Sequence, residues 1–574
     1  MRYPVLFFII TLGVAALAAC GDSSAPAPAP RDTPAPDALR EHSKLFEKEV
    51  VEVTDGVYVA VGFGLANSIM LEGDDGIIIV DTMETVAEGE AVLAAFREIT
   101  DKPIAAIIYT HNHADHVFGA RAFAAPGEVP VYAHQSTGYY INRVVNQIRP
   151  IITARSMRMF GHHLPEGERI NDGIGPHLGV SEESTLFALP PDRTVDERLE
   201  TTIAGIKLEL VHAPGETEDQ LFVWLPEKKV VLSGDNIYQT FPNLYTIRGT
   251  YYRDVQKWAA SLDKIRALDA EFLVPSHTRP LSGRERIHDT LTDYRDAIQY
   301  VHDQTLRHMN KGLTPDQIVE RVQLPPHLAE SPWLQEFYGK VSWSVRSVFD
   351  GYLGWFDGNP STLQPLPGDR RARHMAELAG GEQALADKAR AALDRGDAQW
   401  ALSLSDHLRA LRPDDDTVNQ LRAEALRRLG EVEANPNARN YYFTAAREEA
   451  DGLKPGFRTQ TPAGFLDTLP IENFLAAMPA FLKAEDTLDV HEKLGFQFAD
   501  SGRRFTLEIR RGVAQVHPGL AEDTVAVLHT REPVWKAIAA GNRSAVTALA
   551  GDDLDIDGDK IAALRLLGYF EKVD

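Results

Sequence analysis

The stretch Thr110-His111-Asn112-His113-Ala114-Asp115-His116 places three imidazoles and one carboxylate within six consecutive positions. It follows the apolar, partly β-branched run 104–110, which is typical of a buried strand. The ligand-type side chains therefore lie on the loop that leaves a strand, where His111 and His113 can face one side and Asp115 and His116 turn with the chain. Zn²⁺ takes such imidazole and carboxylate groups as ligands. The stretch predicts a site for two metal ions about 3.5–4 Å apart, not a solvated polar loop.

The run 111–116 resembles the His-x-His-x-Asp-His signature of the metallo-β-lactamase superfamily. Members of that superfamily fold as an αββα sandwich with a one- or two-metal site at one edge of the sheets. The resemblance implies the same fold and a metal site here. It does not by itself imply a substrate.

The resemblance also implies the remaining metal ligands, which follow later strands. Glu216 stands after the turn Ala213-Pro214-Gly215, where many members carry a metal-binding histidine. Asp235 ends the hairpin 221–235 at the position of a bridging carboxylate, and His277 ends the last buried strand, 271–277. The expected arrangement is one Zn²⁺ on His111, His113 and Glu216, a second on Asp115, His116 and His277, and Asp235 shared between them.

Asp81 closes another buried strand, 77–82, before the helix expected at 86–98. It is either a cap of that helix or a partner that orients a metal-bound imidazole. The matching aspartate of the superfamily has the second role, which metal sites commonly require. In such a site the carboxylates offset the 4+ charge, and a bridging water loses a proton near neutral pH and becomes the nucleophile.

Further motifs resemble the alkylsulfatase branch of the superfamily. They are Glu216 itself and the runs 243–249, 173–175 and 352–360. Members of this branch cleave sulfate esters of long alkyl chains, such as dodecyl sulfate. Their Asn and Arg in the 243–249 segment bind the sulfate group, and these residues are Asn243 and Arg248 here. An arginine fork suits a tetrahedral oxyanion, so Asn243, Arg248 and Asp115 are the expected catalytic set.

Other residues near this site are open to two interpretations. The segment 125–200 is longer than the matching segment of the small metallo-β-lactamases, and its loops would lie over the metal site. Four of its arginines either bind an anion or lie on solvated helix faces: Arg143, Arg149, Arg155 and Arg158. Thr278 and Arg279 stand where family members often carry a second histidine and an aromatic residue. Arg279 could therefore supply an extra anion contact.

Composition limits the partners. The chain has 574 residues, which predicts two to four domains, and a net charge of −24. That charge argues against nucleic acid and anionic membrane surfaces as partners. An anion site in such a body must be locally basic.

The N-terminus resembles a bacterial lipoprotein signal, residues 1–19, cleaved before Cys20, which would carry the lipid. A plain secretory signal is the alternative. Cys20 is the only cysteine, so disulfides within a monomer are excluded. The Ala/Pro-rich segment 20–44 is expected to be an extended tether. The predicted location is the cell envelope, on the periplasmic or extracellular face, with the membrane contacted only through the anchor.

The expected architecture is a catalytic α/β domain at 45–315, an all-α domain at 316–452 and an α+β domain at 466–574. Apolar residues at helical spacing over 381–430 resemble tetratricopeptide hairpins, which in the family form a homodimerisation domain; packing within one subunit is the alternative. The last domain resembles the sterol-carrier-protein type 2 fold, whose apolar tunnel would suit alkyl chains.

Three functions fit these features. The first is a dinuclear zinc alkylsulfatase that yields an alcohol and inorganic sulfate, by attack at sulfur or at carbon. The second is a metallohydrolase of another ester class. The third is a lipid- or surfactant-binding lipoprotein with a structural metal site. Mn²⁺ or Fe²⁺ could replace Zn²⁺ among such ligands.

Overall fold

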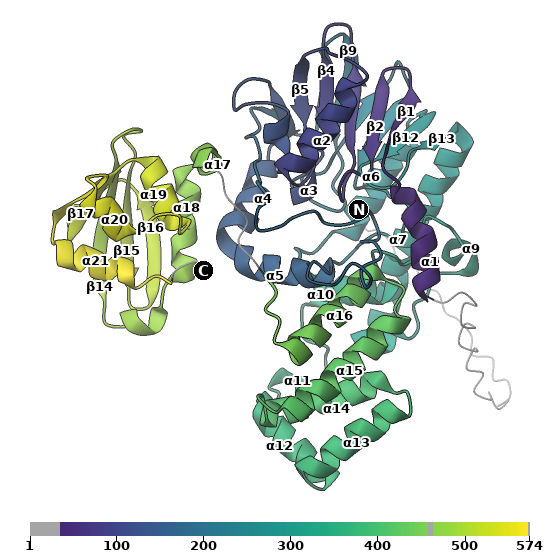
Figure 1. The fold of residues 1–574 in the computed structure, drawn as a ribbon, viewed down its shortest axis with the longest axis vertical. Helices are drawn as coiled ribbons and strands as arrows, with labels where there is room; N and C mark the ends of the chain where they lie inside the picture. The colour runs from purple at the N-terminus through teal and green to yellow at the C-terminus, as the bar shows by residue number, and fades with distance from the viewer. Residues whose placement is uncertain (1–34, 457–462, 572–574) are drawn as a thin grey trace, which may run out of the picture.

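The computed structural model describes residues 35–456 and 463–571. The first of its three bodies is a sandwich of two sheets (Figure 1). One sheet has the order β1-β2-β3-β4-β5-β6-β7 and the other β13-β12-β11-β10-β9-β8. The first sheet comprises β1 (Glu49–Thr54), β2 (Val57–Val61), β3 (Ser68–Glu72), β4 (Ile77–Val80), β5 (Ile104–Ile108), β6 (Val131–His134) and β7 (Arg193–Val195). The second comprises β8 (Arg198–Ile203), β9 (Ile206–His212), β10 (Leu221–Leu225), β11 (Val230–Gly234), β12 (Phe272–Pro275) and β13 (Leu281–Ser282).

Apolar side chains of both sheets meet in one core between them. Val59, Ile78 and Ile108 of the first sheet pack in a cluster with Leu210 and Leu232 of the second, all with no more than 1% of their surface exposed. The outer faces are covered by helices: α2 (Val86–Arg97) on the first sheet, α6 (Val255–Arg266) and α7 (Arg284–Met309) on the second. Strands buried on both faces read as continuous apolar runs, as in β4 and β5. The αββα sandwich expected from the sequence is confirmed.

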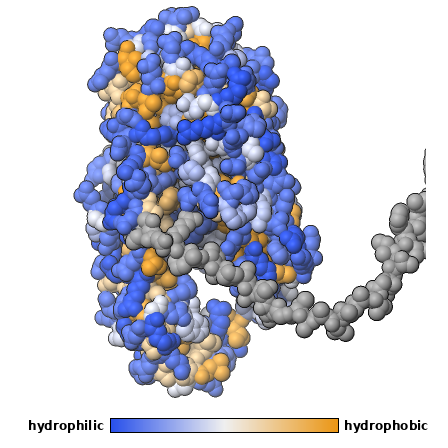
Figure 2. Space-filling model, turned by 90° about the vertical axis from the view of Figure 1, so that its right-hand side faces the viewer, coloured by the Kyte–Doolittle hydropathy of each residue, from blue (hydrophilic) through white to orange (hydrophobic). Residues whose placement is uncertain are grey.

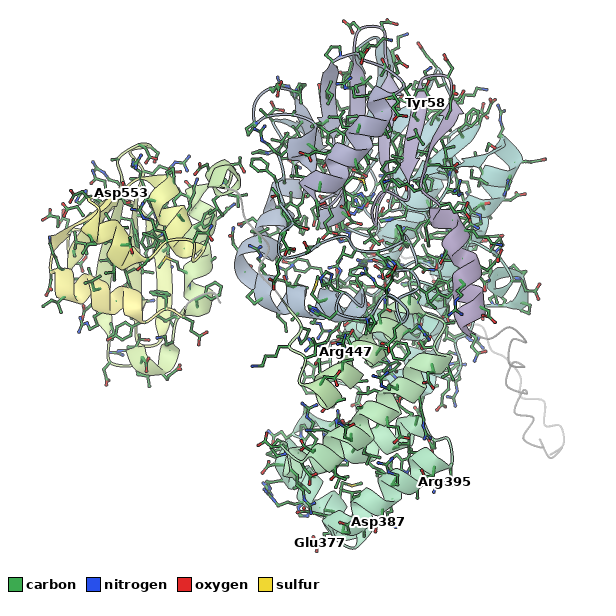
Figure 3. The ribbon with its side chains drawn as sticks, in the orientation of Figure 1. Tyr58, Glu377, Asp387, Arg395, Arg447 and Asp553 are labelled. Carbon is green, nitrogen blue, oxygen red and sulfur yellow. The ribbon has the colours of Figure 1, made fainter. Side chains whose placement is uncertain are left out.

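The segment between β6 and β7 forms a group of helices, which we call the roof. It contains α4 (Thr137–Arg143), the π-helix η3 (Val144–Ile148) and α5 (Arg149–Met159). Two short helical turns, α3 (Ala114–Val117) and η2 (Ala120–Ala122), follow β5. The roof is tied to the helical domain, where Arg158 Nε lies 2.6 Å from Glu448 Oε1. Arg447, labelled in Figure 3, donates to the carbonyl oxygen of His163 at the same junction.

The second body is helical. It comprises α8 (Pro315–Val319), α9 (Pro326–Ala329), α10 (Val341–Leu353), α11 (Pro360–Leu363), α12 (Gly368–Ala379), α13 (Glu382–Asp394), α14 (Ala398–Leu411), α15 (Asp416–Val432) and α16 (Pro436–Asp451). The antiparallel pairs expected over 381–430 are present as α13–α14 and α14–α15, whose buried faces form one cluster. Figure 3 places Glu377, Asp387 and Arg395 at the far end of this domain.

The third body is a five-stranded sheet with helices, ordered β16-β15-β14-β17-β18. Its elements are α17 (Ala463–Thr468), α18 (Ile471–Ala477), β14 (His491–Phe498), β15 (Arg504–Arg510), β16 (Val513–Pro518), β17 (Ala526–Thr530), α19 (Glu532–Ala539), α20 (Ala545–Ala550), β18 (Leu554–Gly558) and α21 (Lys560–Gly568). The α18 helix contacts η3, and Leu469 packs in the same cluster as Val145 of η3. The domain therefore touches the roof of the sandwich.

One expectation about elements was wrong, and two features of the third body were not expected. The tether expected to reach residue 44 ends earlier, because α1 (Ala35–His42) and η1 (Ser43–Phe46) pack onto the body. Leu39 is fully buried, and His42 Nε2 donates to the Gly173 carbonyl oxygen at 2.7 Å. In the third body β18 was not expected, and residues 532–550 form two helices, α19 and α20, on either side of Gly541, whose φ is +74°.

The expected signal peptide, Cys20 and most of the tether lie outside the described residues. Within the described ranges, no helix combines the length and the apolar character needed to cross a bilayer. The face shown in Figure 2 is largely hydrophilic, with hydrophobic residues in scattered patches, as expected for a chain with net charge −24.

Candidate metal centre

Four loops at one edge of the sandwich bring the predicted metal ligands together. The loop after β5 carries His111 to His116, and Glu216, Asp235 and His277 follow β9, β11 and β12. Their ligand atoms fall into three overlapping groups, within each of which all atoms lie within 4.8 Å of one another. The groups are His111, His116 and Asp235; Asp115, His116 and His277; and His113, Glu216 and Asp235.

Asp235 is the common member of this centre. Its Oδ2 lies 3.2 Å from His277 Nε2, 3.5 Å from His116 Nε2 and 3.6 Å from His111 Nε2. Gly234 supplies the backbone that permits this: its φ is +56°, and a Cβ there would lie 2.0 Å from Gln220 Nε2. A side chain at 234 would therefore move the loop that presents Asp235.

The side chains predicted to bind the second metal ion, Asp115, His116 and His277, also lie close together. Asp115 Oδ2 lies 3.5 Å from both His116 Nε2 and His277 Nε2. In the first set, His113 and Glu216 share a group with Asp235, whereas His111 is grouped with His116 and Asp235. The structure thus brings all seven residues into one centre, with Asp235 between the two sets.

Three of the four imidazoles of the centre have a ring nitrogen without a hydrogen-bond partner among the described residues. Nε2 of His111, His116 and His277 and Oδ1 of Asp235 are buried and make no hydrogen bond to any described residue. Buried polar atoms are normally satisfied, and each orphan needs an explanation. Cations held by these nitrogen and oxygen donors would satisfy all four atoms, so the residues present fit a metal centre.

Asp81 holds several parts of the centre in place. Its Oδ2 accepts hydrogen bonds from His116 Nδ1, Thr110 Oγ1 and Ser276 Oγ, each at 2.8 Å, and its Oδ1 accepts from the Thr110 backbone N–H. The contact to His116 places the proton on Nδ1 and leaves Nε2 as the ligand atom. Asp81 itself has φ +61°, a strained conformation for a non-glycine residue.

His277 is oriented in the same way by a different partner. Its Nδ1 donates to the Leu65 carbonyl oxygen at 2.9 Å. The next residue, Thr278, has φ +66° and donates from its hydroxyl to the His277 carbonyl oxygen. Two of the imidazoles therefore have their tautomers set by the surrounding protein.

Glu216 is held by two side chains that the sequence analysis did not identify. Arg253 Nη1 lies 2.8 Å from Glu216 Oε1, and the Tyr238 hydroxyl donates to Glu216 Oε2 at 3.0 Å. The same two side chains contact the backbone of Asn243: Arg253 donates to its carbonyl oxygen, and the Tyr238 hydroxyl accepts from its N–H at 2.9 Å. The loop of Glu216 is thereby fixed relative to the 243–249 segment.

Electrostatics keeps the shared carboxylate charged. Burial alone would raise the pKa of Asp235, but the imidazoles of His277, His116 and His111 hold that pKa well below its ordinary value. Burial raises the pKa of Glu216, and the Arg253 guanidinium opposes this rise. A charged Asp235 is the form that binds a cation.

A first cavity, the apolar cavity, of about 180 Å³ opens onto Asp115, Asp235 and His277. Its wall is mostly aliphatic and aromatic, from the roof helices and the 174–186 segment: Ile141, Val144, Val145, Ile152, Met157, Phe160, Ile174, Leu178, Val180 and Leu186. Glu84 also lines it, and burial raises the pKa of this carboxyl well above its ordinary value. The apolar cavity suits a hydrocarbon chain whose polar end lies at the centre.

A second cavity, the arginine-lined cavity, of about 300 Å³ lies on the other side of His113 and Arg248. Both cavities share Asn112, His113, Val144, Ile152 and Arg248 as lining residues. The second also contains Arg143, Arg155 and Arg253, the carboxylates of Glu216 and Glu218, and the aromatic rings of Tyr140, Tyr251 and Tyr252.

The two expected sulfate contacts differ in position. Arg248 lies where the two cavities meet, with Nη2 3.2 Å from His113 Nε2. Asn243 is fully buried and lines neither cavity, and both polar atoms of its amide lack a hydrogen-bond partner in the described chain.

The other arginines are divided between structural and cavity positions. Arg279 does not face the centre: it pairs with Glu49 and donates to the Glu47 carbonyl oxygen, so the expected extra anion contact was wrong. Arg155 donates to the carbonyl oxygens of Ile247 and Arg248 at 2.5 and 2.8 Å. Arg158 pairs with Glu448, whereas Arg149 and Arg143 each line a cavity.

Residues that sequence reasoning missed share one property. Arg253, Tyr238, Glu84 and Asp219 reach the centre or its loops by contacts between distant segments; Asp219, for example, accepts from Asn112 Nδ2 and Thr137 Oγ1. No local motif marks any of them. The buried N–H groups of Arg253 that lack an acceptor indicate a functional residue, and only the structure shows them.

Comparisons with known proteins agree with this geometry. Residues 61–277 match the metallo-beta-lactamase superfamily, 314–452 alkyl sulfatase dimerisation and 459–574 alkyl sulfatase C-terminal. A linear primary-alkylsulfatase of a Pseudomonas species is 39% identical over 526 residues, covering 88% of this chain and 98% of its own. An alkyl/aryl-sulfatase of Saccharomyces cerevisiae is 28% identical, covering 95% and 86%.

A solved structure is also similar over nearly the whole chain. It is that of a stereoselective inverting sec-alkylsulfatase from a Pseudomonas species. The TM-score is 0.87 at 27% identity, and the match covers 94% of this chain and 87% of that one.

Proposed function

This chain belongs to the alkylsulfatase family of the metallo-β-lactamase superfamily, and on that premise we propose that it hydrolyses sulfate esters of linear alkyl chains, such as dodecyl sulfate, with two zinc ions per subunit. The observation that supports this most directly is the position of the apolar cavity, which ends on Asp115, Asp235 and His277 beside the Arg248 guanidinium. A hydrocarbon tail and an anionic head therefore have adjoining places.

The seven side chains of the centre would hold the two zinc ions. The chemistry that zinc ions supply when bound is Lewis-acid polarisation of a substrate oxygen and a lowered pKa of water. The donor set agrees with this metal, since imidazole nitrogens and carboxylate oxygens are its usual protein ligands besides thiolates. Metal analysis of the purified protein, with zinc exchanged for Mn²⁺ or Fe²⁺ as a comparison, tests the identity of the ions.

The chain's own residues would prepare the ester for attack. Arg248 offers a planar set of N–H donors for the sulfate oxygens. The amide of Asn243 has no hydrogen-bond partner among the described residues, but Asn243 lines neither cavity. The aliphatic wall of the apolar cavity holds the alkyl chain and excludes water from it. Asp81 and the Leu65 carbonyl oxygen keep the imidazoles of His116 and His277 in one orientation.

Release of inorganic sulfate from dodecyl sulfate tests the activity. We expect turnover by the zinc-loaded protein and at least a thousandfold loss in the His113→Ala variant, because a ligand of the centre is removed. His374→Ala is the matched control, since His374 lies on the exposed surface of α12. Zinc binding without release of sulfate from any alkyl or aryl sulfate would contradict the proposal. Water labelled with ¹⁸O shows whether attack is at carbon, with label in the alcohol, or at sulfur, with label in sulfate.

We also propose that the protein is a homodimer and a lipoprotein of the cell envelope. The first rests on the match of 314–452 to alkyl sulfatase dimerisation, the second on the signal-like segment 1–19 and Cys20. Cys20→Ser is expected to move the protein from the membrane fraction to the soluble fraction. An unchanged membrane fraction would contradict the lipid anchor.

A further inference from the structure

The arginine-lined cavity is positively charged in a protein whose net charge is −24. Four arginines and two glutamates line it. Both glutamates are already paired, Glu216 with Arg253 at 2.8 Å and Glu218 with Lys257 at 2.9 Å. The remaining positive charge lies beside the metal centre, in a cavity that shares Val144 and Ile152 with the apolar cavity.

Two of these arginines have donors that the protein leaves unused. Arg253 is 4% exposed, and its Nε and Nη2 make no hydrogen bond to any residue of the described chain. Arg143 forms no ion pair with a described carboxylate; its guanidinium carbon lies 3.0 Å from the centre of the Tyr251 ring. Buried arginine N–H groups without acceptors are costly, and an oxyanion would provide acceptors for them.

Arg248 connects this cavity with the place of the ester. Arg248 lines both cavities. An anion in either cavity can therefore contact the same guanidinium. Arg155 holds the backbone of residues 247 and 248 and is thereby occupied. Arg143 is thus the outer arginine with a free charge, whereas the inner one, Arg253, is paired with Glu216 and offers only its unused N–H groups.

We propose that the arginine-lined cavity is a second anion subsite, which receives inorganic sulfate after cleavage while the alkyl product still occupies the apolar cavity. This inference rests on the proposed function, since sulfate is the anion that the reaction would produce. The cavity accepts a tetrahedral oxyanion through Arg143, Arg248 and Arg253. Separate places for the two products allow each to leave by its own side.

Calorimetric titration of inorganic sulfate into the metal-loaded protein at constant ionic strength tests the subsite without any turnover. We expect Arg143→Gln to weaken sulfate binding about five- to tenfold, the effect of losing one charge-assisted contact. Arg143→Lys should recover most of the affinity. Arg193→Gln is the control with the same charge change, because Arg193 is an exposed residue of β7. An Arg143→Gln variant that binds sulfate as the wild type does, or a wild type that binds none, overturns the subsite.

Double inhibition with sulfate and octan-1-ol tests the separation of the two places. The subsite predicts that both inhibitors bind at once, so their effects multiply. Mutually exclusive binding overturns it. The two proposals fail differently. If the protein turns over no sulfate ester but binds sulfate in a way that depends on Arg143, only the proposed sulfatase activity is contradicted. If it turns over the ester but its sulfate binding does not depend on Arg143, only the subsite is contradicted.

Discussion

Asp81 shows how much one residue contributes to the centre without being a ligand. Its carboxylate joins the loop after β5 to Ser276, the neighbour of His277, and fixes the His116 ring. All of these contacts are buried. The relative positions of ligands from both sheets therefore depend on this side chain.

The Asp81→Asn variant is expected to bind zinc about 10- to 100-fold more weakly, the usual effect of losing such a partner. An amide presents one acceptor oxygen where the carboxylate presents two, so His116 or Thr110 loses its acceptor. Competition with a chelator measures the affinity. Asp55→Asn is the control, because the Asp55 side chain is fully exposed; equal zinc affinity in both variants would contradict the role of Asp81.

At this scale, the sequence predicted the residues that a compact motif or a strand end identifies. His111 to His116 are contiguous, and Asp235 and His277 directly follow apolar runs. Arg253 and Tyr238 could not be predicted, because their contacts to Glu216 span 37 and 22 residues and no pattern marks them. Arg279 was assigned wrongly because its partner, Glu49, lies 230 residues away.

Among the elements, the roof helix α5 determines the shape of the apolar cavity. Ile152, Thr153, Ser156 and Met157 reach its wall from this one helix, and Phe160 reaches it from the position directly after the helix. Residues three and four apart share a helix face, so a single helix can present this continuous surface. The length of alkyl chain that fits should depend on it.

Thr153→Phe is expected to reduce kcat/KM for dodecyl sulfate about tenfold more than for hexyl sulfate. The added ring occupies space that the distal methylenes need, and each buried methylene contributes about 0.8 kcal/mol. Steady-state kinetics over a series of chain lengths measures the change. Val546→Phe on the exposed surface of α20 is the control, and an unchanged chain-length profile in Thr153→Phe would contradict the placement of the chain.

The α1 helix is expected to loosen in mild acid. Burial lowers the pKa of His42 to about 4 from 6.5, so the unfolded segment takes up a proton between those values and the folded one does not. Stability is therefore complete above pH 6.5 and falls as the pH drops towards 4, by about 3 kcal/mol at most.

Hydrogen exchange over residues 35–46 measures this local stability. In the His42→Gln variant the slope between pH 6.5 and 4 should be much smaller, because the titrating group is gone. Exchange in this segment that does not respond to pH in the wild type would contradict the assignment. The half-buried His162 lies outside residues 35–46 and does not contribute to the local signal.

Elements differ in how far the sequence predicts them. The apolar runs of β4, β5 and β10 define strands without ambiguity. In contrast, β18 reads Leu-Asp-Ile-Asp-Gly and pairs along only one side with β17; two aspartates in five residues are atypical of strands. The α1 helix was missed because Ala and Pro in the preceding segment suggested an extended chain, whereas packing of Leu39 and His42 stabilises the helix.

At the scale of the whole molecule, the assembly of two copies depends on exposed surface, and the helical domain has exposed apolar residues near the end of α10. Leu353, Trp355 and Leu363 are 60%, 71% and 55% exposed. They lie within the stretch matched by alkyl sulfatase dimerisation. Large apolar side chains that are this exposed and close together in the sequence are candidates for the contact with a second copy.

The Trp355→Ser/Leu363→Ser double variant is expected to shift the protein from dimer to monomer by at least tenfold in dissociation constant. The reason is the loss of two large apolar side chains from the contact with a second copy. Light scattering after size exclusion measures the mass. Val513→Ser/Val546→Ser is the control for surface apolarity, because both residues are exposed and lie in the third body. A dimer that is unaffected by the first pair would place the contact elsewhere in the helical domain.

The order of bodies along the chain was predictable from the resemblance to the alkylsulfatase family, and their mutual contacts were not. The contact of α18 with η3 and the Arg158–Glu448 ion pair join segments about 300 residues apart. Such contacts depend on the shapes of folded surfaces, which a linear pattern does not encode.

The ligands of the centre are spread from His111 to His277, over both sheets. A growing polypeptide therefore cannot capture its cations until nearly the entire sandwich has left the ribosome. If the chain crosses a membrane before folding, it crosses without them. The cations must then be acquired from whatever supply exists at the destination, and scarcity there would limit how much newly made protein becomes active, however much is synthesised.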